Sequence, residues 1–267
     1  MLSEKVLTDE ALFDSLDLRT VDGLRTDLVT SHFSPVRIPE GYGYKGSAAR
    51  ALALRNLHID PSYLPRDTDL IRITEEPFPG ADNHYAYTHM PDDFAHGWGI
   101  EVVNNLNEYF GTRDFTLNEV IATDEMLIAT QRCIEDSRGG VVRLSAYEHD
   151  LFDGPGPRMV SKMLRFYSEI KYRRGFAELA NTSGRENEAG ATTAFWMAEQ
   201  LERAYQHGEV YAAAFVAELC SRGHLPRDLT AQEATAHLKE LLPEDPDYYR
   251  FPIRGRFANK VIWQSIS

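Results

Sequence analysis

The chain has 267 residues, of which 43% are hydrophobic and 26% are charged, a composition typical of a globular protein in water. No apolar run approaches the roughly 18 residues that a membrane span requires, so we expect no membrane partner. The 28 lysines and arginines stand against 41 aspartates and glutamates, which leaves a net charge of −13 at pH 7. Because binding many phosphates requires a surplus of cations, any nucleic-acid site is expected to be local.

The N-terminus and the cysteines favour a reducing compartment. The first ten residues are acidic and lack the basic and then apolar pattern of an export signal. Cys133 and Cys220 lie far apart and show no Cys-x-x-Cys spacing. We therefore expect a cytoplasmic protein.

The first two regions are predicted as a helical appendage, residues 1–40, and a mixed α+β head domain, residues 41–152. Apolar residues at broadly helical spacing predict a helix over residues 1–30. From Tyr42 a short strand leads through a glycine turn into a helix, for which Ser47 is the expected N-cap. Further strands are predicted at Thr68–Ile73 and Gly99–Val103.

The third region, residues 153–267, is predicted to be all helical. The segment Asp153-Gly-Pro-Gly-Pro157 is the strongest break in the chain, and no strand pattern follows it. A Thr230-x-x-Glu233 capping box opens the last helix. The helices expected here are Met159–Arg174, Ala191–His207, Glu209–Arg222 and Thr230–Leu242.

Asp67 and Asp69 form an Asp-x-Asp pair at the start of a predicted strand. Side chains alternate across a strand, so both carboxylates point to one face, where they repel unless cations lie between them. Such a pair suits two Mg²⁺ ions in phosphoryl or nucleotidyl transfer. An exposed pair of turn residues is the alternative.

Gly46 and Ser47 end the preceding strand and open a helix. The backbone N–H groups of a helix start bind phosphate, Ser47 can donate to a phosphate oxygen, and Arg50 lies one turn further on. A tight turn at Gly46 followed by a Ser47 cap is the structural alternative.

Three motifs occur in order along the chain: Gly46-Ser-Ala-Ala-Arg50, Asp67-Thr-Asp-Leu70 and Arg113-Asp-Phe-Thr-Leu-Asn118. They resemble those of the tRNA CCA-adding enzyme and bacterial poly(A) polymerase family, the class II head domain of the nucleotidyltransferase superfamily. Arg113-Asp-Phe-Thr-Leu-Asn118 is similar to the family's Arg-Asp-Phe-Thr-Ile-Asn. Gly46-Ser-Ala-Ala-Arg50 resembles its Gly-Gly-x-x-Arg, and Asp67-Thr-Asp-Leu70 its Asp-x-Asp-Leu. The three occur in the family's order, which implies a polymerase-β-like head with a small mixed sheet and a helical neck.

The resemblance also implies roles for individual residues. Arg113, Asp114 and Asn118 are expected to face the nucleotide, and Glu101 on a neighbouring strand is expected to be a third metal ligand. For Glu101, an outward-facing glutamate on an amphipathic strand is the alternative. The spacing Thr116-x-x-Glu119 separately predicts a capping box at the start of a helix.

The segment Pro157–Phe166, followed by Gly175-Phe176, is similar to the family's neck helix, but the Glu-Asp pair that reads the incoming base there is absent. Arg158, Lys162 and Arg165 recur at helical spacing and predict one basic face, either solvated or contacting phosphates of an acceptor. The resemblance ends near Phe176, without the family's body and tail domains.

Together these features predict an enzyme, a nucleotidyltransferase that uses two Mg²⁺ ions to transfer a nucleoside monophosphate from ATP or another NTP to an acceptor hydroxyl. The expected acceptor is an RNA 3′ end, such as that of a tRNA in a toxin or defence role. The competing hypothesis is a degenerate head fold that serves as a binding or scaffold protein, such as an antitoxin or assembly subunit. The missing Glu-Asp pair and Ser47, where the family has Gly, favour it.

Overall fold

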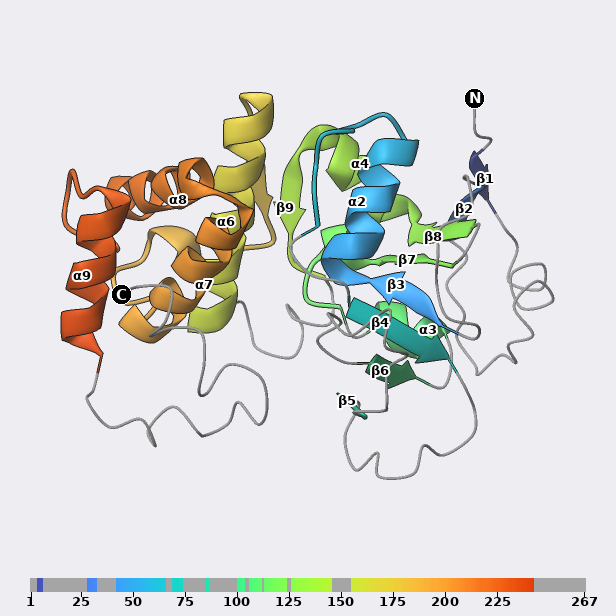
Figure 1. Cartoon of the computed structure of the whole chain (residues 1–267), viewed down its shortest axis with the longest axis horizontal. Helices are drawn as coiled ribbons and strands as arrows, with labels where there is room; N and C mark the ends of the chain where they lie inside the picture. The colour runs from blue at the N-terminus through green and yellow to red at the C-terminus, as the bar shows by residue number, and fades with distance from the viewer. Residues whose placement is uncertain are drawn as a thin grey trace. The chain divides into compact units, whose positions relative to one another are not determined.

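The computed structural model describes residues 4–6, 28–32, 42–65, 69–73, 85–86, 100–103, 106–111, 113–123, 126–145 and 155–242. The fold is mixed α+β, as predicted, and forms two compact units (Figure 1). The first unit comprises Met1–Gly139 and Ser145–Glu148, and the second comprises Gly140–Leu144 and His149–Ser267. The sequence predicts the domain boundary at residue 153. The second unit also includes residues upstream of it, Gly140–Leu144 and the start of the segment that begins at His149. No helix in the described ranges has the length and apolar character that crossing a membrane requires.

Eight strands of the described chain form one mixed sheet in the first unit, in the order β1-β2-β8-β7-β3-β4-β6-β5. Strands β4 and β6 pair in parallel and the other neighbours are antiparallel. The strands are β1 Glu4–Val6, β2 Leu28–His32, β3 Gly43–Lys45, β4 Asp69–Ile73, β5 Tyr85–Ala86, β6 Ile100–Val103, β7 Val120–Ala122 and β8 Met126–Thr130. The predicted strands near Tyr42, at Thr68–Ile73 and at Gly99–Val103 are confirmed as β3, β4 and β6.

Helices cover both faces of this sheet because the central strands are apolar on both sides. Helices α2, Gly46–Asn56, and α4, Gln131–Gly139, pack on the face that carries Val120 and Ala122. Helix α3, Leu106–Gly111, packs on the other face with Ile121 and Ile128. Because side chains alternate along β7, Val120 and Ala122 belong to one hydrophobic core and Ile121 belongs to the core on the other face. The sheet therefore lies between two layers of helices.

Three local predictions in the first unit are wrong. Residues 4–6 and 28–32 are strands rather than parts of one helix; the rest of residues 1–30 lies outside the described chain. Helix α2 begins at Gly46 with Lys45 in the N-cap position, so Ser47 is not the cap. Thr116–Asn118 is a short 3-10 turn followed by β7, not the start of a capped helix. The hydroxyl of Thr116 donates instead to Asp136, over 2.7 Å.

The second unit contains the four predicted helices, each confirmed to within one turn. They are α6 Pro157–Arg174, α7 Ala194–His207, α8 Glu209–Ser221 and α9 Ala231–Leu241. The predicted capping box of Thr230 and Glu233 is present. The unit also has a parallel strand pair, β9 Val141–Arg143 and β10 Glu178–Ala180, and β10 departs from the all-helical prediction. Its core is built from apolar residues of all four helices around Phe215.

Candidate functional site

The turn from β3 into α2 lies directly beside Asp69. Gly46 has a φ of +57°, a left-handed conformation that favours glycine over residues with a Cβ. A Cβ placed on Gly46 would lie 3.5 Å from Oδ2 of Asp69, so the half-buried carboxylate lies against the turn. Lys45 is the register partner of Asp69 in the β3–β4 pair. The structure therefore brings together the predicted phosphate turn and one of the predicted metal ligands; Asp67 lies outside the described residues.

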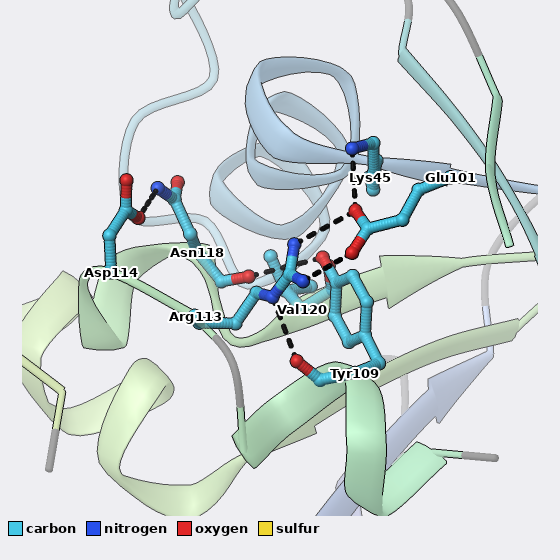
Figure 2. Close-up of polar contacts among 7 residues, drawn as sticks. All are labelled: Lys45, Glu101, Tyr109, Arg113, Asp114, Asn118 and Val120. Atoms are coloured by element: carbon cyan, nitrogen blue, oxygen red, sulfur yellow. Dashed lines mark hydrogen bonds and ion pairs between the residues drawn. The ribbon is translucent and has the colours of Figure 1, made fainter. Parts of the chain in front are cut away.

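Glu101 on β6 binds two cationic side chains, those of Lys45 and Arg113 (Figure 2). Its Oε2 accepts from Nζ of Lys45 at 2.6 Å and from Nη1 of Arg113 at 3.1 Å. Its Oε1 accepts from Nη2 of Arg113 at 2.5 Å. Glu101 is only 3% exposed, so its carboxylate lies inside the protein.

These contacts bear on the metal-ligand role expected for Glu101. Burial alone raises the pKa of its carboxyl, but Lys45 and Arg113 outweigh burial and hold the pKa below its ordinary value of 4.5. Both oxygens are engaged by cationic side chains, which leaves the carboxylate poorly suited to act as a third metal ligand. Within the described ranges, no group of three or more His, Cys, Asp and Glu side chains forms a metal cluster.

Arg113 is fixed from several directions. Its Nε donates to the carbonyl of Tyr109 at 2.8 Å, and its guanidinium lies 4.0 Å from the centre of the Tyr109 ring. The hydroxyl of Tyr109 in turn donates to the carbonyls of Asn118, at 3.2 Å, and Val120, at 3.0 Å. Burial lowers the pKa of Arg113, but Tyr109 and Glu101 outweigh it and raise the pKa, so the guanidinium stays charged. The result is a rigid cation held in a largely dry environment.

A second chain of contacts joins the Arg113 motif to α2. Oδ1 of Asp114 accepts from Nδ2 of Asn118 at 2.7 Å and from the backbone N–H of Phe115 at 2.9 Å. Oδ1 of Asn118 accepts from Nη1 of Arg50 at 2.6 Å, and Nη2 of Arg50 donates to the hydroxyl of Tyr63 at 2.7 Å. Arg50, Asp114 and Asn118, predicted separately from two motifs, therefore form one hydrogen-bonded group.

Sequence reasoning missed Lys45, Tyr63 and Tyr109. Lys45 carries only a partial signal, because alternation places it on one face of β3 but its pairing with Asp69 depends on the sheet register. We find no sequence signal for Tyr63, which follows α2 in an irregular segment and is 7% exposed.

The predicted basic face of α6 is wrong in one of its three members. Arg158 is exposed and Lys162 is half-buried, but Arg165 is only 2% exposed. Arg165 donates to Glu169 at 2.7 Å and to Gln200 at 2.8 Å. This arginine therefore belongs to the core of the helical unit, and its expected contact with acceptor phosphates is corrected.

No protein-family profile matches the sequence, and no curated protein matches it at a significant level. Among solved structures, the chain is similar to a CCA-adding enzyme in complex with CTP (12% identity, TM-score 0.42) and to one in complex with ATP (14%, 0.40). It is also similar to the Thermotoga maritima CCA-adding enzyme complexed with tRNA-CCA (12%, 0.35).

The alignments cover 84%, 84% and 81% of this chain but only 61%, 60% and 49% of those enzymes, so the chain spans about half to three fifths of their length. At such low identity and TM-score the likeness carries no information on substrate, metal or activity.

Proposed function

We propose that this protein is a metal-dependent nucleotidyltransferase, which transfers a nucleoside monophosphate from an NTP to an acceptor hydroxyl. The observation that carries the proposal is the position of Asp69 against the Gly46 turn, at the start of α2. A helix N-terminus attracts phosphate, and a carboxylate beside it can hold a cation that bridges to the same phosphate. The two groups are 23 residues apart in the sequence and meet only in the fold.

The start of α2 is the proposed site for the triphosphate. The first turn of a helix leaves backbone N–H groups without partners inside the helix, and α2 has no acidic residue in that turn. The hydroxyl of Ser47 would donate to a phosphate oxygen, and the fixed guanidinium of Arg113 would supply charge. Because these groups are held before substrate arrives, little ordering is needed on binding.

Asp67 and Asp69 are the proposed metal ligands, and the position of Asp69 fits this role. Mg²⁺ held by them would activate the acceptor hydroxyl and neutralise the departing pyrophosphate. Glu101 does not fit as a third ligand and instead holds Lys45 and Arg113 in place. We propose that Arg50, Asn118 and Asp114 orient the nucleotide as one hydrogen-bonded group.

The proposed acceptor is an RNA 3′ end. Arg158, which is exposed, and Lys162, which is half-buried, remain the candidate phosphate contacts on α6. The test is to incubate the purified chain and Mg²⁺ with each α-³²P-labelled NTP, together with total cellular RNA or total protein. Label in the RNA fraction is expected. Label in the protein fraction would contradict the RNA acceptor. If RNA, protein and small molecules all remained unlabelled, the transfer activity itself would be contradicted.

A catalytically degenerate binding protein is the second candidate, favoured by one specific observation: both oxygens of Glu101 are occupied by cations. The two candidates differ in nucleotide binding. The enzyme should be stabilised by NTP with Mg²⁺, by about 2.7 kcal/mol at a ligand concentration a hundred times the Kd. A thermal midpoint that no NTP shifts would favour the binding protein.

A further inference from the structure

The C-terminal end of α6 carries an unusual density of cations and aromatic rings. The segment Lys171-Tyr-Arg-Arg-Gly-Phe176 has three cations, two aromatic residues and no acid. Tyr172 is 54% exposed and Phe176 is 50% exposed, and they make up two of the five large hydrophobic residues found exposed in the described chain. In Figure 1 this end of α6, drawn in yellow, projects beyond α8.

Neighbouring residues hold both rings in place. Tyr172 meets Tyr211 of α8 edge to face, with ring centres 5.5 Å apart, and Arg173 donates to the hydroxyl of Tyr211 at 2.7 Å. The guanidinium of Arg174 lies 4.5 Å from the centre of the Phe176 ring. The ring of Phe176 also lies against Gly140, since a Cβ built there would be 3.0 Å from it. Both half-exposed rings are therefore held by neighbouring groups, which lowers the entropy that a stacking partner would remove.

The acid that pairs with Lys171 is covered. Glu218 of α8 is 8% exposed and accepts from Arg222 at 2.6 Å and from Lys171 at 3.4 Å. The side chain of Lys171 nevertheless remains 51% exposed. Within residues 171–176 all the charged side chains are basic, although the whole chain carries a net charge of −13. Glu178 and Glu209, just outside this segment and two residues from Phe176 and Tyr211, are exposed.

Helix electrostatics explain only part of this arrangement. Cations in the last turn stabilise the negative end of a helix, which accounts for Lys171, Arg173 and Arg174. The same effect gives no reason for two large rings to face water beside them. Exposed aromatic planes interleaved with cations are what a single-stranded nucleic acid requires, because its bases stack on rings while its phosphates contact the cations.

We propose that this α6-end surface, formed by residues 171–176 with Tyr211, binds single-stranded RNA. Bases stack on Tyr172 and Phe176, and Lys171 and Arg174 contact the phosphates. The inference deepens the proposed function by placing an RNA contact at the opposite end of α6 from Arg158; the helix has 18 residues and is about 27 Å long. Duplex RNA fits poorly, because its bases are stacked on one another and unavailable to the rings.

The experiment measures binding of a fluorescein-labelled, 12-nucleotide single-stranded RNA by anisotropy, without NTP, from low to moderate salt. Tyr172→Leu and Phe176→Leu keep apolar packing but remove the ring, and each should weaken binding about fivefold or more at unchanged salt slope. Lys171→Gln with Arg174→Gln should instead lower the salt slope by about 1.4, at about 0.7 per phosphate contact.

Two matched controls are exposed residues of the same unit, Val210→Ala and Arg227→Ala, and neither should change binding. Asp69→Asn should lose transfer of label but bind RNA normally. Failure of the proposed transfer activity and failure of RNA binding at the α6-end surface can therefore be told apart. The proposal is overturned if the RNA does not bind at low salt, if the ring variants bind like wild type, or if a duplex of equal length binds as tightly.

Discussion

Each of the two units buries a glutamate that binds two basic side chains, but the two clusters lie in different surroundings. In the sheet unit, Glu101 is joined to Lys45 of β3 and to Arg113, beside Asp69. In the helical unit, Glu169 is joined to Arg165 of the same helix and lies 3.2 Å from His207 of α7. The first cluster lies in the proposed nucleotide site and the second in a core. Burial and charge alone therefore do not distinguish the two clusters, and the proposed function rests on the position of the first beside the Gly46 turn.

The largest expected effect is on the helical cluster. Arg165→Met leaves Glu169 buried with much of its compensating charge removed, which should lower the free energy of unfolding by about 3 to 5 kcal/mol. Urea unfolding measures this, with the exposed Arg158→Met as a control expected to change little. If Arg165→Met were as stable as wild type but failed to transfer label, Arg165 would be a substrate contact and our correction would be mistaken.

A slightly smaller effect is expected from Glu101→Gln, which leaves Lys45 and Arg113 without their buried counter-charge and should cost about 3 kcal/mol of stability. The proposed role also predicts that the variant still binds Mn²⁺, measured by electron paramagnetic resonance in the folded protein. Loss of Mn²⁺ binding from folded protein would restore Glu101 as a metal ligand.

Acid should weaken both clusters. Burial raises the pKa of Glu169, but Arg165 and His207 outweigh it and lower the pKa to about 2, and the pKa of Glu101 is also lowered. A lowered pKa gives stability that is present above the unfolded value of 4.5 and lost as pH falls toward the folded value. Unfolding free energy should therefore fall between about pH 4.5 and pH 2. In Glu169→Gln, stability at pH 7 should be lower and its decline in this window shallower; an identical decline would contradict the assignment.

The smallest effect concerns Tyr63, which accepts a hydrogen bond from Arg50 at 2.7 Å. Tyr63→Phe should lower stability by about 1 kcal/mol and weaken NTP binding, because Arg50 loses a partner that orients it. Isothermal titration with a non-hydrolysable NTP analogue measures the second effect. The control is Tyr205→Phe in the helical unit, and equal affinity in wild type and Tyr63→Phe would show that Tyr63 does not position Arg50 for the nucleotide.

Local spacing predicted the helices of the second unit and the strand, turn and helix around Gly46, because caps, glycines and periodicity act within a few residues. The same rules failed at Thr116 and Glu119. Their side chains contact Asp136 and Thr130, 20 and 11 residues away, instead of capping a helix. Lys45 was missed for the same reason, since Glu101 lies 56 residues further on. Arg165 was assigned to a basic surface because helical spacing cannot distinguish an exposed cation from one paired inside the core.

The most direct test of the account is the transfer of label from α-³²P-NTP to RNA by an Asp67→Asn, Asp69→Asn variant. Transfer should fall by about a thousandfold or more, because the proposed metal ligands are lost, while the thermal midpoint without metal stays the same or rises as repulsion is relieved. Asp228→Asn is the matched control: Asp228 is exposed, and its left-handed backbone, with a φ of +63°, suits Asn as well as Asp. Wild-type transfer by the folded double variant would contradict the central claim.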